Sequence, residues 1–263
     1  MSSEIADRIA VAKMVAYDAG KLLMKYWGHL DSYQKKDSTD LVTEADRAAE
    51  ALIHDKVASR FPQDEFFGEE GGLDRNCGGF RWVVDPLDGT TNFVHGVPLF
   101  AVSVGIEADC KGVAGVVYLP ATRELFFASS GQGAFGPSGK LCVSKTSRFG
   151  DALLCTGIPY RGKDMLEVLL EDWRRAVTHG QGLRRQGSAA TDLAYVAAGR
   201  FELFFERELK PWDTAAGAVI VAEAGGRLSD FSGQPFSPYK GEILASNGLL
   251  HEQALEMLFG GRK

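Results

Sequence analysis

The spacing of apolar residues changes twice along the chain, and this change constrains the fold more than any single motif. Residues 5–26 repeat apolar side chains every three or four positions, and a similar segment runs from Thr43 to Pro62, which predicts two amphipathic helices. Short β-prone runs separated by turn residues follow at 80–84, 100–106, 112–119 and 124–128. From residue 152 onward, strand-like and helix-like segments alternate up to a helical pattern over 249–259. This order predicts an α+β fold, with mixed layers of sheet and helix.

The length of 263 residues suits one large domain or two closely packed halves. A chain of this size can bury a core without disulfides or a structural metal. No repeat, low-complexity tract or flexible linker interrupts it. We therefore expect a single unit over 1–263, with an α+β half over about 1–150 and an α/β half over about 151–263.

The chain carries 35 acidic and 29 basic residues, a net charge of -6. This balance argues against nucleic acid as the main ligand, because phosphate backbones attract basic surfaces. No apolar stretch is long enough to span a bilayer and no signal peptide is visible, so we expect a cytoplasmic protein without a membrane partner. The cysteines have no metal-ligand spacing and are expected to be free thiols: Cys77, Cys110, Cys142 and Cys155.

The most informative motif is WVVDPLDGTTNF over 82–93. A β-prone run delivers Asp85, a proline shapes the bend, and Asp88 follows three residues later. Two carboxylates on one tight turn can bridge hard cations, which prefer oxygen ligands. The next residues, Gly89 and Thr90, can turn N–H groups and a hydroxyl toward a phosphate. Taken alone, the two aspartates could equally form Asx turns beside glycine and proline.

Three further carboxylates each allow two interpretations. Glu69 follows an apolar pair and could be a metal ligand and a base that orients water, or part of a solvated acidic loop. Asp213 stands at the start of a helical segment. It could be the N-cap, a position that aspartate favours, or it could complete a metal site from the second half of the chain. Asp46, near the start of the second helix, has the same ambiguity.

These motifs, in this order and at this spacing, resemble the inositol monophosphatase family, which includes related sugar bisphosphatases and nucleotide phosphatases. The resemblance covers nearly the whole chain. It rests on DLVTEAD at 40–46, GEE at 68–70, DPLDGTTNF at 85–93, WDTAAG at 212–217 and EAGG at 223–226. It implies a layered αβαβα sandwich, a magnesium-dependent and lithium-sensitive phosphatase, and a homodimer.

The resemblance also implies metal ligands. Glu69, Asp85 and the carbonyl oxygen of Leu87 look like ligands of a first Mg²⁺, and Asp85, Asp88 and Asp213 look like ligands of a second. Glu69 would also support a third, loosely held ion through water. Clustered carboxylates are costly unless cations lie between them, and an all-oxygen ligand set suits magnesium.

Catalytic roles follow from the same resemblance. Thr90 and Glu69 look like the pair that orients the attacking water, and Asp46 looks like a partner that tunes the Thr90 hydroxyl. The backbone N–H groups of Gly89 and Thr90 would hold the phosphate.

Substrate contacts are implied at four positions. Lys35, beside Lys36, matches a basic position near the phosphate or the third metal. Glu206 matches a position that contacts substrate hydroxyls, but could also be an edge-strand carboxylate facing water. Arg184 and Ser188, with Arg185 between them, match a segment near the substrate or the subunit interface, or form a solvated basic turn and a helix cap.

The expected function is hydrolysis of a small phosphorylated polyol or sugar, with myo-inositol monophosphate as the leading substrate. The reaction would use a metal-activated water and no covalent intermediate. The residues after the DGT motif read TNFVHG at 91–96, as in the inositol monophosphatase branch, and differ from the Lys-Gly-Phe variation of phosphoadenosine phosphatases. Two alternatives remain. One is a fructose 1,6-bisphosphatase or histidinol-phosphatase of the same family, and the other is a metal-regulated interaction partner with secondary catalysis.

Overall fold

The computed structural model of the chain describes residues 2–29, 34–35, 41–69, 78–159 and 165–260. The described helices are α1 (Ser2–Tyr26), α2 (Glu44–Arg60), α3 (Thr90–Val94), α4 (Leu166–His179), α5 (Ala189–Ala197), α6 (Pro211–Glu223) and α7 (His251–Ala254). Short helical turns accompany them: η1 (Phe149–Asp151), η3 (Pro238–Lys240) and η4 (Leu255–Phe259).

The strands form two large sheets and one small ladder. The first sheet has the order β3-β4-β5-β6-β7-β8-β9 and the second β11-β10-β12-β14-β13, while β1 pairs with β2. The strands of the first sheet are β3 (Glu65–Gly68), β4 (Phe80–Asp88), β5 (Ala101–Ala108), β6 (Lys111–Leu119), β7 (Glu124–Ser129), β8 (Gly133–Gly136) and β9 (Gly139–Lys140). Those of the second sheet are β10 (Leu153–Thr156), β11 (Gly182–Arg184), β12 (Leu203–Glu206), β13 (Arg227–Ser229) and β14 (Ile243–Ser246), and the ladder joins β1 (Gln34–Lys35) to β2 (Leu41–Val42).

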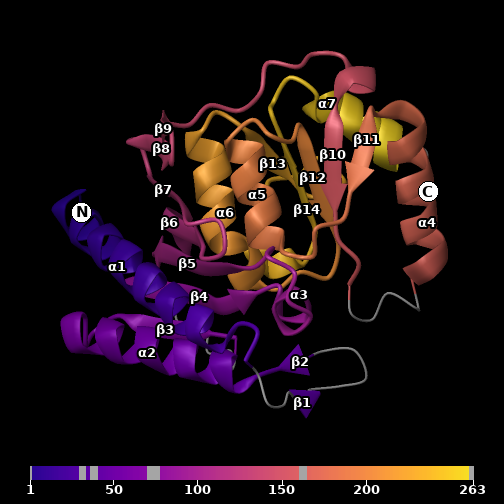
Figure 1. Ribbon diagram of the computed structural model, residues 1–263. Helices are drawn as coiled ribbons and strands as arrows, with labels where there is room; N and C mark the ends of the chain where they lie inside the picture. The colour runs from indigo at the N-terminus through magenta and orange to yellow at the C-terminus, as the bar shows by residue number, and fades with distance from the viewer. Residues whose placement is uncertain (1, 30–33, 36–40, 70–77, 160–164, 261–263) are drawn as a thin grey trace.

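Helices and sheets alternate in layers (Figure 1). The helices α1 and α2 cover the outer face of the seven-stranded sheet, and α5 and α6 lie between the two sheets. The helices α4 and α7 cover the outer face of the five-stranded sheet. The predicted αβαβα sandwich is therefore confirmed, since each sheet buries both of its faces against helices.

The middle layer is held close to the first sheet by glycines. A Cβ at Gly105 on β5 would lie 2.8 Å from the Cβ of Ala215, and one at Gly115 on β6 would overlap the backbone of Ala216. Only hydrogen at these two positions allows α6 to approach the strands this closely. This contact fixes the start of α6, and with it Asp213, beside the end of β4.

Two local details differ from the sequence-based expectations. Residues after the DG dipeptide form the short helix α3, which was not predicted. Asp213 is not an N-cap: α6 begins at Pro211 after Lys210, and the Asp213 carboxylate accepts a hydrogen bond from the Lys210 N–H at 2.6 Å. The Asp213 carboxylate therefore stabilises the helix from its first turn, by accepting a hydrogen bond from the backbone of the N-cap residue.

The cysteines differ from the expectation of free thiols. Cys110 is disulfide-bonded, Cys142 and Cys155 are free, and Cys77 lies outside the described residues. Disulfides are rare in reducing compartments, so the cysteines give no support to a cytoplasmic location.

Among the helices that the structure describes, none combines the length and the apolar character that crossing a bilayer requires.

His251 is fully buried under the second sheet, between two serine hydroxyls. The Ser229 hydroxyl donates to the carbonyl of Asp230, so it accepts from the Nε2–H of His251 at 2.9 Å. The other ring nitrogen, Nδ1, then accepts from the Ser246 hydroxyl at 2.8 Å. This network suits the neutral imidazole, and burial lowers the pKa of His251 to about 4.

A lowered pKa in the folded state predicts a loss of stability in acid. Between pH 6.5 and pH 4 the unfolded chain binds a proton at His251 that the folded chain does not bind. We expect the free energy of unfolding to fall by about 3 kcal/mol more in the wild type than in His251→Gln over this range. Urea titrations of both proteins from pH 7 to pH 4 measure the difference. Parallel pH curves would show that His251 is not held neutral.

Candidate active site

A cavity of about 790 Å³ opens where the ends of the two sheets meet α5 and α6. Most of the residues predicted for catalysis and metal binding line it: Glu69, Asp85, Leu87, Asp88, Gly89, Thr90, Ser188, Glu206 and Asp213. The structure thus brings together residues from both sheets that are more than 100 positions apart.

A β-bulge places the two aspartates of β4 on the same side of the strand. Asp85 pairs with Ser103 and Asp88 with Ala101, so three steps on β4 oppose two steps on β5. In a regular strand, side chains three residues apart point to opposite faces. The extra residue in the bulge turns both carboxylates toward α6. There, oxygens of Asp85, Asp88 and Asp213 lie within 4.8 Å of one another.

Each of these carboxylates is held in place by a hydrogen bond to one oxygen. The Leu87 N–H donates to Asp85 Oδ1 at 2.9 Å. The Ser188 hydroxyl and the Ala190 N–H both donate to Asp88 Oδ2 at 2.7 Å. With Asp213 held by the N-terminal turn of α6, all three are fixed in orientation while still able to bind a cation.

The electrostatics of the cluster favour divalent cations. Burial, followed by the charges of Glu69 and the other two aspartates, raises the pKa of Asp85 well above its usual range. Burial and the charge of Asp88 do the same for Asp213, and burial raises the pKa of Asp88 to about 6. Cations between these groups would offset both the burial and the repulsion. The donors are all oxygens, so the residues fit Mg²⁺.

Thr90 lies beside this cluster and contacts Asp46. Its hydroxyl is 3.1 Å from Asp46 Oδ1 and 3.0 Å from the carbonyl oxygen of Leu87, and its one proton can be donated to either. The other oxygen of Asp46 accepts from the N–H and hydroxyl of Thr43, the N-cap of α2. Burial raises the pKa of Asp46. Asp46 therefore serves both as helix cap and as a hydrogen-bond acceptor for Thr90.

Glu206 closes the cavity from the second sheet, at the end of β12. Its carboxyl lies directly against Gly157, where a Cβ would overlap it. Burial, then the charges of Asp213 and Asp88, raises the pKa of Glu206 to about 8, and Arg185 opposes this shift. The contact between Gly157 and the Glu206 carboxyl was not predicted from the sequence, because no feature of the sequence near Gly157 indicates it.

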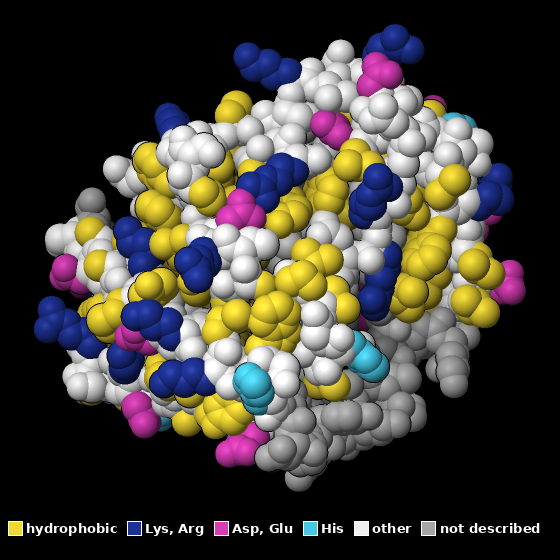
Figure 2. Space-filling model, in the orientation of Figure 1, with side chains coloured by type: hydrophobic (Ala, Val, Ile, Leu, Met, Phe, Trp, Pro, Cys, Tyr) yellow, Lys and Arg dark blue, Asp and Glu magenta, His cyan; other side chains and the backbone are white. Residues whose placement is uncertain are grey.

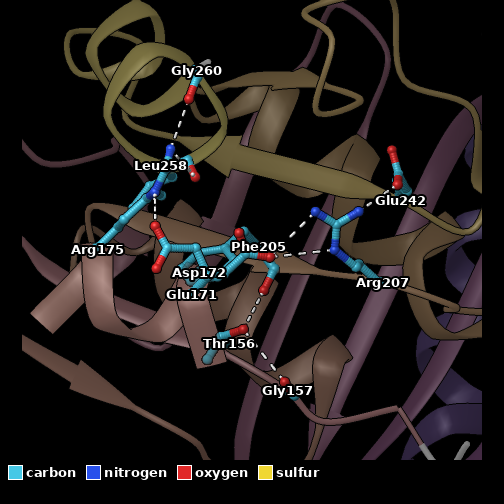
Figure 3. Close-up of polar contacts among 10 residues, drawn as sticks. All are labelled: Thr156, Gly157, Glu171, Asp172, Arg175, Phe205, Arg207, Glu242, Leu258 and Gly260. Atoms are coloured by element: carbon cyan, nitrogen blue, oxygen red, sulfur yellow. Dashed lines mark hydrogen bonds and ion pairs between the residues drawn. The ribbon is translucent and has the colours of Figure 1, made fainter. Parts of the chain in front are cut away.

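The residue after Glu206 is anchored on the outer side of the second sheet (Figure 3). Arg207 Nη1 lies 2.8 Å from Glu242 and its Nη2 lies 3.2 Å from Asp172 of α4. The guanidinium also stacks over Phe231, at 4.3 Å from the ring centroid. These contacts fix the end of β12 and so restrict where Glu206 can point.

Arg207→Met is expected to lower the free energy of unfolding by about 3 kcal/mol, because the buried Asp172 carboxylate loses the cation that faces it. A matched control is Arg227→Met, which removes an ion pair to Glu252 whose side chains are both exposed, and should cost less than about 1 kcal/mol. Urea unfolding at pH 7 measures both. Equal costs would mean that burial does not strengthen the Arg207 pair.

Three predicted substrate contacts have different settings in the structure. Arg184 is exposed and is not among the described residues that line the cavity. Its neighbour Arg185 lines the cavity. Ser188 lines the cavity, but its hydroxyl donates to Asp88 and caps α5, which supports a role in positioning that carboxylate. The side chain of Lys35 lies outside the described part of the chain.

The chain matches one protein family over nearly its whole length. The family model described as "Inositol monophosphatase family" matches residues 4–259. The chain is 42% identical over 240 residues to an inositol-1-monophosphatase of Rhizobium meliloti, covering 90% of each chain. It is 44% identical over 244 residues to the Nus factor SuhB of Pseudomonas aeruginosa, again covering 90% of each.

Another relative and a solved structure extend the similarity. A fructose-1,6-bisphosphatase/inositol-1-monophosphatase of Thermotoga maritima is 36% identical over 255 residues, covering 96% of both chains. The crystal structure of the extragenic suppressor protein SuhB from Bartonella henselae superimposes with a TM-score of 0.91 at 38% identity, covering 97% of this chain and 100% of that one.

Proposed function

The chain belongs to the inositol monophosphatase family, and from this we propose that it is a Mg²⁺-dependent phosphatase that hydrolyses myo-inositol monophosphate to inositol and phosphate. One observation carries the proposal: carboxylates from β4 and from α6 converge beside Thr90 at the end of a cavity large enough for a small phosphate ester. Because β4 lies in the first half of the chain and α6 in the second, we also propose that residues 1–263 act as one catalytic unit.

The carboxylate cluster defines where magnesium would bind. Glu69, Asp85 and the Leu87 carbonyl oxygen would hold one ion, and Asp85, Asp88 and Asp213 a second. Bound Mg²⁺ would supply charge stabilisation for the phosphoryl group and lower the pKa of water. The hydrogen bonds from Ser188 and Ala190 to Asp88 keep that carboxylate in place for this task.

The other residues of the cavity position water and substrate. The Thr90 hydroxyl, donating to Asp46, can accept a hydrogen bond from the attacking water, and Glu69 would orient the same water. Backbone N–H groups of Gly89 and Thr90 would hold phosphate oxygens. We assign Glu206, on the opposite side, to the substrate hydroxyls.

Phosphate release from a substrate panel tests the proposal. The panel is inositol 1-phosphate, fructose 1,6-bisphosphate, histidinol phosphate and phosphoadenosine phosphate, each with Mg²⁺, with EDTA, and with Mg²⁺ plus Li⁺. A Mg²⁺-dependent preference for inositol 1-phosphate, inhibited by Li⁺, is the expected result. A preference for fructose 1,6-bisphosphate would overturn the substrate assignment in favour of the activity named for the Thermotoga relative.

We also propose a homodimer, on the support of an exposed apolar face of α4. Leu166, Leu170 and Val177 lie four and seven residues apart, which places them on one side of the helix, and they are 51%, 49% and 62% exposed. Figure 2 shows hydrophobic side chains gathered at the edge formed by α4. Apolar patches of this kind are typical of protein interfaces.

Light scattering after size-exclusion chromatography measures the oligomeric state. We expect about twice the 28.5 kDa of one chain for the wild type, and a shift toward the monomer in Leu170→Glu. Val168→Glu is the matched control, because Val168 is also exposed but lies on another side of α4. A wild-type monomer would contradict the proposal.

A second function is favoured by one observation: a relative named Nus factor SuhB is as similar to this chain as those named inositol-1-monophosphatase. The chain could therefore act mainly as an interaction partner, with catalysis secondary. A variant without phosphatase activity that still rescues a deletion phenotype would support this function, and one that fails to rescue would exclude it.

A further inference from the structure

A second cavity, of about 430 Å³, lies farther along α6 than the catalytic cavity. It exists because the helix presents small side chains there: Ala215, Ala218 and Ala222 line it, spaced three and four residues apart. Gly112 of the sheet borders the cavity where the strand packs against α6, and a Cβ there would lie 2.9 Å from Cγ2 of Val219. The space between helix and sheet is therefore left open instead of being filled by side chains.

One carboxylate is buried in the wall of this cavity. Glu107 on β5 follows Ser103 and Gly105 at steps of two, so it points to the same side, toward α6. It is 3% exposed. Its Oε2 accepts from the Tyr239 hydroxyl at 2.7 Å, whereas no hydrogen bond to Oε1 is found within the described residues. A buried carboxylate with a spare acceptor gains most from a donor that carries positive charge.

The remaining charges around the cavity do not satisfy this acceptor. Glu223 is held by the N–H groups of Gly131 and Gly133, both at 2.8 Å. Lys111 is exposed and forms no ion pair with the described residues. The other walls are largely apolar, with Val219 and Phe236 among them.

From these features we propose that this cavity is a second binding site, for a small organic cation with an apolar body. The ammonium or amidinium group donates to Glu107, and the apolar body fills the space beside the alanines of α6. Such a ligand complements both the charge and the surface of the cavity.

The site shares structure with the catalytic cavity. Pro238 and Tyr239 of η3 line both cavities, and the Tyr239 hydroxyl that contacts Glu107 also accepts from Arg81 at 3.4 Å. The helix that forms one wall carries Asp213 at its start. An occupant therefore contacts two elements that shape the catalytic cavity, without touching its carboxylates.

Binding of tryptamine, followed by isothermal titration calorimetry in the presence of Mg²⁺, tests the proposal. Saturable binding at one site is expected, and indole-3-propionate, which replaces the cation with a carboxylate, should bind at least about tenfold more weakly. Glu107→Gln should weaken tryptamine binding by at least about tenfold, whereas Glu167→Gln, which changes an exposed glutamate on α4, should leave it unchanged.

Two further variants locate the bound amine. Ala218→Phe fills the cavity and should abolish binding, even if Glu107→Gln proves unstable. Asp213→Asn, in the catalytic cavity, should leave binding intact. Each of three results would overturn the proposal: no saturable binding to the wild type, binding that persists in Ala218→Phe, or loss of binding in Asp213→Asn. The readout needs no turnover, so a failure here is distinct from a failure of the phosphatase assignment.

Discussion

Asp213→Asn is expected to lower kcat for phosphate release by at least about a thousandfold. Asp213 is the member of the cluster that comes from α6, and its oxygens lie within 4.8 Å of those of Asp85 and Asp88. Asparagine keeps the shape and can still accept the hydrogen bond from the Lys210 N–H, but it lacks the charge that holds a divalent cation. The loss should therefore appear in activity and metal binding, with the fold preserved.

Stability measurements separate this effect from misfolding. In EDTA, Asp213→Asn should be as stable as the wild type or more so, because burial and the charges of Asp88 and Glu69 raise the pKa of Asp213 and disfavour its ionised form. Mg²⁺ should raise the melting temperature of the wild type and have little effect on the variant. Asp55→Asn, at a side chain that is 83% exposed, is the charge-matched control and should keep full activity. Normal turnover by Asp213→Asn would rule out the proposed metal site.

The order of elements could be predicted because it depends on local sequence, whereas the roles of the site residues were implied by the resemblance to a known family. Apolar periodicity predicted the outer helices and the alternating second part, and the DPLDGT motif identified Asp85 and Asp88. The β-bulge that turns both aspartates to one side was not predicted, because it depends on pairing with β5. The sequence places Asp213 near a helix start but does not show whether it caps the helix or faces a cavity.

The remaining features of the site were not predicted because they depend on contacts between distant segments of the chain. Ser188 was expected to contact substrate or cap a helix; the structure shows that it caps α5 and that its hydroxyl also donates to Asp88, one hundred positions away, which was not predicted. Gly157 makes room for Glu206 only because β10 and β12 are neighbours in the second sheet. A single sequence contains no periodicity that reports such pairs, since they arise from the packing of whole layers.

Removing the hydroxyl of Thr90 while keeping its shape is expected to have the second-largest effect. Thr90→Val should lower kcat by about 100- to 1,000-fold, because it removes the hydroxyl that accepts a hydrogen bond from the attacking water and donates its own proton to Asp46. Thr90→Ser keeps the hydroxyl and should stay within about tenfold of the wild type. Initial rates with inositol 1-phosphate at saturating Mg²⁺ measure both variants.

The competing explanation is that Thr90 only stabilises the start of α3, through its contacts to Leu87 and Asp46. In that case Thr90→Val would lower the melting temperature, while the folded fraction would retain normal kcat. A catalytic role predicts the opposite result for Thr90→Val: a small change in melting temperature and a large loss of kcat. Asp46→Asn provides a further check, because it keeps an acceptor for Thr90 but removes the negative charge. If Thr90 acts through Asp46, this variant should lose activity without a comparable loss of Mg²⁺-dependent stabilisation.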